Sequence, residues 1–256
     1  MNDMHNFRTG LTSVTFRQKS IDQIILIARK ARLTGIEWGG DVHLPPGEIQ
    51  LAAKTAKKTH AAGLEVLSYG SYYHGDETED FQAVLATAKA LGAPVIRVWA
   101  GHSTYEESTP EEFTALAKRF AQAAELASKE NIRVSFEYHR GTATQTIDGA
   151  LALLNAAGHP NLSCYWQPNP DITQSEQLAE IDALLPFLSN IHVFTWTGAN
   201  IRHPLSDGTE RWLEYLSHLP EDGSGHDLIL EFVQDDREDA LLQDAKTLHS
   251  WLNQLD

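Results

Sequence analysis

Short runs of β-branched and aromatic residues recur along the whole chain, and polar segments separate them. Such runs are typical of buried β-strands. The eight runs are LTSVTF (11–16), IEW (36–38), LEVLSYG (64–70), VIRVWAG (95–101), IRVSFEYH (132–139), LSCYWQ (162–167), IHVFTW (191–196) and LILEFV (228–233). Their starts are 25 to 37 residues apart, which is the length of a strand, a loop and a helix.

The segments between these runs show the period of amphipathic helices. In SIDQIILIARKAR (20–32), apolar residues at i, i+3, i+4 and i+7 predict one buried helix face, and Ser20 is the predicted N-cap. Thr109 and Glu112 are spaced as a capping box at the start of another helix. Four glycines that shortly precede strands are predicted to end helices in the left-handed conformation: Gly35, Gly63, Gly92 and Gly158.

Strands that alternate with helices predict a parallel sheet, because each strand must cross back over one face before the next begins. Eight such units in 256 residues match the size of an α/β fold, the (β/α)8 TIM barrel. A doubly wound open sheet is the alternative, but the segment VTFRQKS (14–20), where the first run ends, contains no Gly-rich phosphate loop. No linker rich in Pro, Gly or Ser divides the chain. We therefore expect residues 1–256 to form a single TIM barrel domain.

Composition and charge narrow the functional classes. The formal net charge of -15 argues against nucleic acid as a partner, because binding to a phosphate backbone depends largely on Lys and Arg. No apolar stretch approaches the roughly 20 residues of a membrane span, and the segment MNDMHNFRTG has no signal-like core. We expect a cytoplasmic protein without a membrane partner, and a homo-oligomer remains compatible with the sequence. Because Cys164 is the single cysteine, any bound metal depends on His, Asp, Glu or amide ligands.

In a TIM barrel the chemistry lies at the C-terminal ends of the strands, and alternation decides which side chains face the barrel axis. Phe136 and Tyr138 are expected to pack against helices, so Glu137 faces inward. In the last three runs the same alternation turns these residues inward: Gln167, His192 and Glu231. It places Phe232 against the helices. Two buried carboxylates are costly and repel each other, and a divalent cation such as Mn, Zn, Co or Mg would offset both effects.

The segments at the predicted strand ends resemble those of the xylose-isomerase-like TIM barrel family. They are GIEWGGDVH (35–43), FEYH (136–139), YWQPN (165–169), HVF (192–194) and LILEF (228–232). The resemblance spans nearly the whole chain. The family includes sugar-phosphate isomerases and epimerases, hydroxypyruvate isomerase, an inosose dehydratase and the endonuclease IV branch, so the resemblance is specific at the metal positions and weak as to substrate.

In ketose epimerases of this family, Glu, Asp, His and Glu from the fifth to the eighth strands hold the metal, and both Glu residues also act as acid and base. The resemblance therefore implies a divalent cation on Glu137, Gln167, His192 and Glu231, with Glu137 and Glu231 as catalytic residues. Gln167 departs from the pattern because the family usually has Asp there, and Pro170 replaces a family His three residues later. Because Gln167 is neutral, the two negative charges of Glu137 and Glu231 balance the charge of one divalent cation. We expect a metal that is bound more weakly but is more strongly electrophilic.

Further residues at the strand ends are candidate contacts for a carbohydrate substrate. They are Glu37, Trp38, His43, Tyr69, Trp99, His139, Trp196 and Arg202. The Trp rings could stack on sugar faces or pack the barrel, and the His residues could equally be loop residues. The resemblance implies that Arg202 meets the substrate. Its fork of donors suits a carboxylate or a phosphate, and a pair with Asp207 is the structural alternative.

The leading hypothesis is a metal-dependent isomerase or epimerase of a sugar, a sugar phosphate or a keto-polyol, because removing a proton next to a carbonyl needs a cation and a carboxylate base. A lyase of the inosose dehydratase type begins with the same proton abstraction and is the near alternative. The departure at Gln167 leaves a non-catalytic sugar-binding barrel open, although two buried carboxylates weigh against it. A DNA-repair endonuclease is disfavoured, since that branch needs a richer His/Asp set and a basic groove.

Overall fold

Eight parallel strands close into a barrel in the computed structural model, which describes residues 7–198, 201–220 and 225–255. The barrel strands are β1 (Arg8–Thr12), β2 (Gly35–Gly39), β3 (Glu65–Gly70), β4 (Val95–Val98), β5 (Arg133–Phe136), β6 (Leu162–Trp166), β7 (Leu188–Val193) and β10 (Asp227–Leu230). They pair in the order β1-β10-β7-β6-β5-β4-β3-β2, and β2 pairs with β1 to close the ring. The predicted (β/α)8 fold is confirmed.

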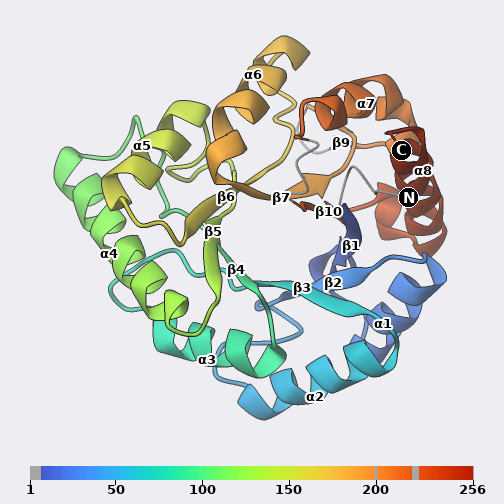
Figure 1. Cartoon of the computed structure of the whole chain (residues 1–256), viewed down its shortest axis with the longest axis horizontal. Helices are drawn as coiled ribbons and strands as arrows, with labels where there is room; N and C mark the ends of the chain where they lie inside the picture. Colours follow the sequence, from blue (N-terminus) through green and yellow to red (C-terminus); the bar gives the residue numbers. More distant parts are fainter. Residues whose placement is uncertain (1–6, 199–200, 221–224, 256) are drawn as a thin grey trace.

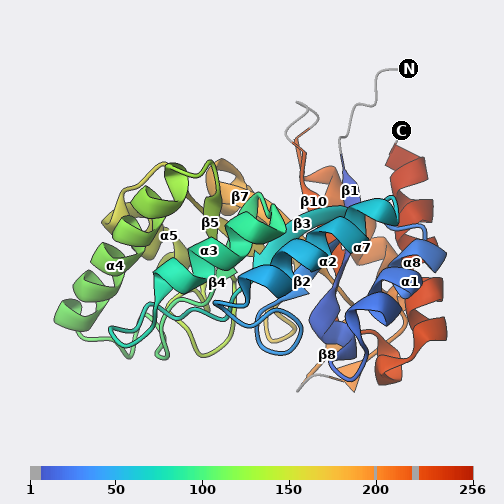
Figure 2. The same cartoon turned by 90° about the horizontal axis from the view of Figure 1, so that it is seen from below.

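The α-helices form a ring around the strands (Figure 1). They are α1 (Ile21–Lys30), α2 (Ile49–Ala61), α3 (Phe81–Leu91), α4 (Pro110–Ser128), α5 (Ile147–Ala157), α6 (Gln174–Leu184), α7 (Thr209–Ser217) and α8 (Glu238–Leu255). Four short 3-10 segments complete the helices: η1 (Ser13–Phe16), η2 (Leu185–Phe187), η3 (Leu205–Gly208) and η4 (Gln234–Asp236). A small antiparallel hairpin of β8 (Trp196–Thr197) and β9 (Ile201–Arg202) follows β7, and β8 lies below the barrel in Figure 2. Within the described ranges, no helix is long and apolar enough to cross a membrane.

Several strand boundaries differ from the sequence prediction. The first strand begins before the predicted run 11–16 and includes only its first two residues, while the other four form η1. The hydroxyl of Ser13 accepts a hydrogen bond of 2.9 Å from the backbone N–H of Gly39, which holds this turn against β2. All four residues of η1 are buried, and a buried turn has the same apolar composition as a buried strand. The fourth, fifth, seventh and eighth strands end before their predicted ends, at Val98, Phe136, Val193 and Leu230.

The helix termini mostly follow the predicted chemistry. Ser20 and Thr109 both form capping boxes. Gly92 and Gly158 end α3 and α5 in the left-handed conformation, and Gly63, directly after the C-cap of α2, has a φ of 74°.

Gly35 does not end a helix, contrary to the prediction. Arg32 takes the left-handed conformation after α1, with a φ of 57°, and Gly35 lies inside β2. A Cβ atom on Gly35 would lie 2.5 Å from the backbone oxygen of Glu65. Glycine is therefore needed here because β3 approaches closely.

The barrel interior holds a small apolar cluster below the polar strand ends. Leu67, Tyr165 and Ile229 form this cluster, while a larger core packs between the strands and the helices. The pairing of β2 with β3 shifts register next to Glu37, so Ser68, the neighbour of Leu67, also faces the interior. The hydroxyl of Ser68 donates a hydrogen bond of 2.7 Å to Glu37. The shift thus supplies a polar partner for a fully buried carboxylate.

Candidate metal centre

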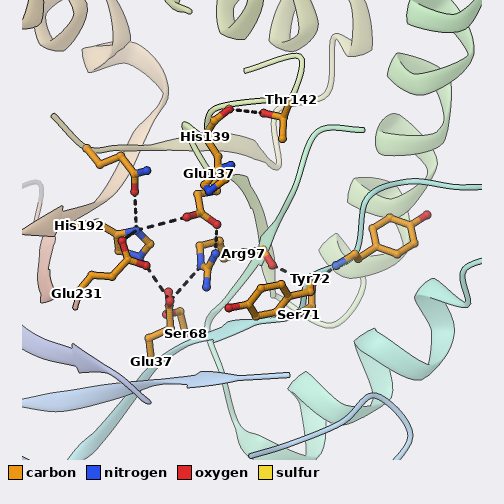
Figure 3. Close-up of polar contacts among 12 residues, drawn as sticks. Glu37, Ser68, Ser71, Tyr72, Arg97, Glu137, His139, Thr142, His192 and Glu231 are labelled. Carbon is orange, nitrogen blue, oxygen red and sulfur yellow. Dashed lines mark hydrogen bonds and ion pairs between the residues drawn. The ribbon is translucent and has the colours of Figure 1, made fainter. Parts of the chain in front are cut away.

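Four side chains converge at the C-terminal ends of β5, β6, β7 and β10; we call Glu137, Gln167, His192 and Glu231 the donor cluster. The ring of His192 is fully buried, and its Nδ1 lies 2.8 Å from Oε1 of Gln167. The same nitrogen lies 3.4 Å from Oε2 of Glu231 and 3.8 Å from Oε1 of Glu137. Figure 3 shows both carboxylates next to the His192 ring. The structure brings all four predicted ligands together.

The donor cluster has the spacing and chemistry of a site for one divalent cation. Ligand bonds of about 2.1 Å place neighbouring ligand atoms roughly 3.0 to 3.4 Å apart. The distances from Nδ1 of His192 run from 2.8 to 3.8 Å, and one donor atom each of Glu137, His192 and Glu231 lie within 4.8 Å of one another. Two carboxylates, an amide oxygen and an imidazole are compatible with Mn, Zn, Co or Mg. The residues present therefore fit a metal.

Glu37 lies on the other side of the His192 ring and is fully buried. Nε2 of His192 makes no hydrogen bond within the described part of the chain, but it lies 3.4 Å from Oε1 of Glu37. Burial raises the pKa of Glu37, whereas Arg97 and His192 lower it, and the net pKa is well below the usual value. An ionised carboxylate behind an imidazole fixes the ring and its tautomer. Glu37, predicted as a substrate contact, is placed to direct Nδ1 of His192 toward the donor cluster.

Arg97 on β4 is the residue of the site that the sequence prediction missed. Its side chain is 2% exposed and contacts both Glu37 and Glu137 (Figure 3). Its Nε donates to Oε1 of Glu37 at 3.0 Å, and its Nη1 donates to Oε2 of Glu137. Alternation along VIRV (95–98) could have revealed it, because both neighbours of Arg97 pack in the outer core.

The two carboxylates of the donor cluster are therefore not equivalent. One oxygen of Glu137 is occupied by Arg97, and the other faces His192. Glu231 faces His192 as well, but no Lys or Arg of the described ranges lies within ion-pair distance of it. Glu231 thus has the less compensated charge of the two.

Gln167 connects the donor cluster with a cavity of about 640 Å³, whose wall it forms together with loop residues after β5, β6, β7 and β10. This volume lies within the roughly 300 to 1,000 Å³ of small-molecule sites. Three of the predicted substrate contacts line the cavity: His139, Trp196 and Arg202. The prediction thus identified part of its wall.

Trp99 supports this wall by stacking on His139, and Asp236 holds Arg202 in it. The ring of Trp99 stacks on His139 with 4.2 Å between the ring centroids. Burial lowers the pKa of His139, although the backbone oxygen of Arg140 raises it, so burial favours the neutral ring. Arg202 pairs with Asp236 and not with Asp207, because η4 brings Asp236 beside the hairpin.

The remaining predicted contacts occupy structural positions away from the cavity wall. Trp38 is fully buried in the outer core, with its ring centroid 6.1 Å from that of His43. Nδ1 of His43 lies 3.0 Å from the hydroxyl of Ser13. The hydroxyl of Tyr69 donates to the backbone oxygen of Leu44 at 2.7 Å. These contacts hold the loop after β2.

Phe232 lines the cavity, so its predicted packing against the helices is wrong. The strand ends at Leu230, and Phe232 takes a left-handed φ of 48°, which is unusual for a bulky residue. Its backbone N–H donates to Oγ1 of Thr15 at 3.0 Å, which stabilises the turn. Tyr72 also has a left-handed φ, 57°, and its ring centroid lies 5.6 Å from Cζ of Arg97. Alternation holds only where the chain is extended, so neither orientation was visible in the sequence.

The fold and the site define the class of this protein as a (β/α)8 barrel with a buried carboxylate and imidazole cluster at its C-terminal strand ends. A family model described as "Xylose isomerase-like TIM barrel" matches residues 25–255. The chain belongs to that family, as its strand-end segments predicted.

Known proteins of similar sequence or structure differ in the reactions their names describe. A 3-dehydroshikimate dehydratase of Bacillus anthracis is 24% identical over 211 residues, which cover 76% of this chain and 74% of that protein. The crystal structure of a probable 3-DHS dehydratase involved in petrobactin synthesis in Bacillus anthracis has a TM-score of 0.80 at 20% identity, covering 94% of this chain and 98% of that one. An L-ribulose 3-epimerase structure has a TM-score of 0.75 at 17% identity, with coverages of 96% and 95%. These structural likenesses establish a shared fold.

Proposed function

We propose that the chain is a divalent-metal-dependent isomerase or epimerase that removes a proton next to a carbonyl of a sugar, a sugar phosphate or a keto-polyol. The observation that carries this proposal is the convergence of the donor cluster beside a cavity of about 640 Å³. A divalent cation held there would polarise the substrate oxygens and acidify the neighbouring C–H bond.

The chain's own side chains have distinct parts in this proposal. Glu231 removes the proton, because it faces the donor cluster and its carboxylate has no Lys or Arg partner within the described residues. Glu137, whose carboxylate is positioned by Arg97, returns a proton. Glu37 and Arg97 act behind them by orienting His192 and Glu137.

A dehydratase is the second candidate, and the inequality of the two carboxylates favours it. An epimerase uses its acid and base in exchangeable roles, whereas elimination of water needs one base and a separate acid for the leaving hydroxyl. The pairing of Glu137 with Arg97, while Glu231 has no such partner among the described residues, suits fixed roles. The similarity to a 3-dehydroshikimate dehydratase supports the same candidate.

Metal binding and proton exchange test the proposal. We expect the purified protein to bind Mn, Co, Zn or Mg and to gain thermal stability. With metal, we expect it to exchange a substrate proton for deuterium in heavy water across a panel of ketoses, inososes and 3-dehydroshikimate. A Glu231→Gln variant should lose at least about 100-fold of the exchange rate, while Glu111→Gln, at an exposed position, should not. A protein that neither binds nor is stabilised by these ions contradicts the proposal.

The products separate the two candidates. An isomerase or epimerase gives a product of unchanged formula with deuterium at the reacting carbon, whereas a dehydratase gives a product lighter by one water. Mass spectrometry of the same reactions therefore decides between them.

A further inference from the structure

Three arginines line the cavity from three separate loops: Arg17 after η1, Arg140 after β5 and Arg202 in the β8–β9 hairpin. Asp171 is the single acidic residue of the wall within the described ranges. This concentration of cations is unusual in a chain whose formal net charge is -15. Each of the three arginines pairs with an aspartate, Arg17 with Asp41, Arg140 with Asp171 and Arg202 with Asp236, so cations and anions around the cavity are nearly balanced, unlike in the chain as a whole.

Two of these guanidinium groups are held against one aromatic ring. Cζ of Arg17 lies 5.4 Å from the ring centroid of Phe232, and Cζ of Arg202 lies 4.8 Å from it. The left-handed turn that brings Phe232 into the cavity thus provides a common support for both cations. Backbone strain of this kind is typical of ligand-binding positions.

Aspartates at the rim orient the guanidinium groups without using all their donors. Asp236 accepts from Nη1 of Arg202, and Asp171 accepts from Nη2 of Arg140. The other two nitrogens of each guanidinium have no hydrogen-bond partner within the described part of the chain. The side chains of Asp236 and Asp171 are 46% and 58% exposed, so water screens both pairs. Arg140 and Arg202 can therefore each offer a second edge of the fork to a ligand. Arg17 donates through all three nitrogens, to Asp41, to the backbone oxygen of Val14 and to Tyr72, so it can offer only the remaining N–H bonds of Nη1 and Nη2.

We propose that Arg17, Arg140 and Arg202 form an anion subsite in the cavity, and that the substrate carries a carboxylate or a phosphate group away from its reacting carbonyl. The inference deepens the proposed function and rests on it for the reacting end of the substrate. The donor cluster binds the carbonyl end, and the arginines bind the charged end. The subsite also offsets the repulsion that a chain of net charge -15 exerts on an anion.

Three ligands that share a keto group at C2 and differ only at C6 test the subsite: D-fructose, D-fructuronate and D-fructose 6-phosphate. Binding of each to the Mn²⁺-loaded protein is measured by calorimetry. We expect one charged ligand to bind at least about tenfold more tightly than D-fructose, because each charge-assisted hydrogen bond contributes roughly tenfold or more. The preferred ligand distinguishes a carboxylate from a phosphate. The preference should weaken in 0.5 M NaCl, since salt screens partly exposed charges.

Matched variants distinguish the subsite from chelation of the metal. Arg17→Gln and Arg202→Gln should each weaken the charged ligand roughly tenfold to hundredfold more than they weaken D-fructose. Arg237→Gln is the control, because Arg237 is exposed, pairs with Asp239 and does not line the cavity. Equal binding of charged and neutral ligands, no binding of either charged ligand, or a preference that survives both substitutions overturns the inference.

A separate titration with Mn²⁺ alone keeps the two proposals apart. If Mn²⁺ fails to bind the wild-type protein, the proposed function fails, whereas a charged ligand that still binds through Arg17 and Arg202 upholds the subsite. If Mn²⁺ binds and the arginine variants bind the charged ligands normally, only the subsite fails.

Discussion

Replacing Arg97 with methionine removes the cation that compensates two buried carboxylates. Glu37 is fully buried and Glu137 is 3% exposed, and neither has another Lys or Arg within ion-pair distance in the described ranges. Removing one partner of a buried ion pair typically costs about 3 to 5 kcal/mol, because a charge is left buried and uncompensated. In a chain of this size, 1 kcal/mol corresponds to a Tm change of about 2 to 4 °C, so we expect the Tm to fall by roughly 6 to 20 °C.

Urea unfolding followed by circular dichroism at pH 7, without added metal, measures this loss. Arg237→Met is the control, because it removes an exposed guanidinium and should leave the midpoint unchanged. The double variant Arg97→Met/Glu37→Gln should regain part of the stability, since one of the two uncompensated charges is removed. If Arg97→Met costs less than about 1 kcal/mol, far below the range for buried pairs, the reasoning is refuted and Arg97 does not compensate ionised carboxylates.

Three further predictions concern single positions. Gln167→Glu should tighten Mn²⁺ binding by roughly tenfold, because it adds an anionic ligand of the same length; an unchanged Kd in a competition titration with a chelating dye would show that Gln167 is not a ligand. Burial raises the pKa of Asp244 to about 6. Ionisation of Asp244 therefore lowers the stability of the folded state, fully above about pH 6 and not at all below about pH 4. Asp244→Asn, which can still accept from the N–H of Leu205, should therefore stabilise the fold by about 1 to 3 kcal/mol at pH 8 and by little at pH 4, as thermal melts at the two pH values would reveal. Burial also raises the pKa of the Cys164 thiol, so this thiol should react with an aromatic disulfide reagent at pH 8 only after unfolding; rapid reaction of the native protein would contradict its burial.

Most of the fold could be predicted from local patterns. The recurrence of buried strands and amphipathic helices indicated the barrel, and the capping boxes at Ser20 and Thr109 marked two helix starts. One error lies at η1, because a buried turn has the same apolar composition as a buried strand. Another lies at a helix end, because a residue other than glycine can take the left-handed conformation. Gly35 is the clearest case, because Arg32 takes the left-handed position expected of a glycine.

The candidate ligands could be found from the sequence because alternation is a local property of an extended chain. On β5 to β7 and β10 it directs Glu137, Gln167, His192 and Glu231 to one end of the barrel, and closure of the ring then brings them together. The resemblance to the family added the expectation of a metal. The sequence by itself thus determined which side chains meet.

Only the tertiary structure decided what surrounds them. Arg97 reaches Glu37 across 60 residues of sequence and Glu137 across 40, and no local pattern encodes such a pair. Phe232 enters the cavity because its backbone leaves the extended conformation, and Arg17 and Arg202 then meet on its ring. Side-chain direction along a strand follows from backbone geometry alone, whereas compensation of buried charge and the shape of a cavity depend on contacts between distant segments.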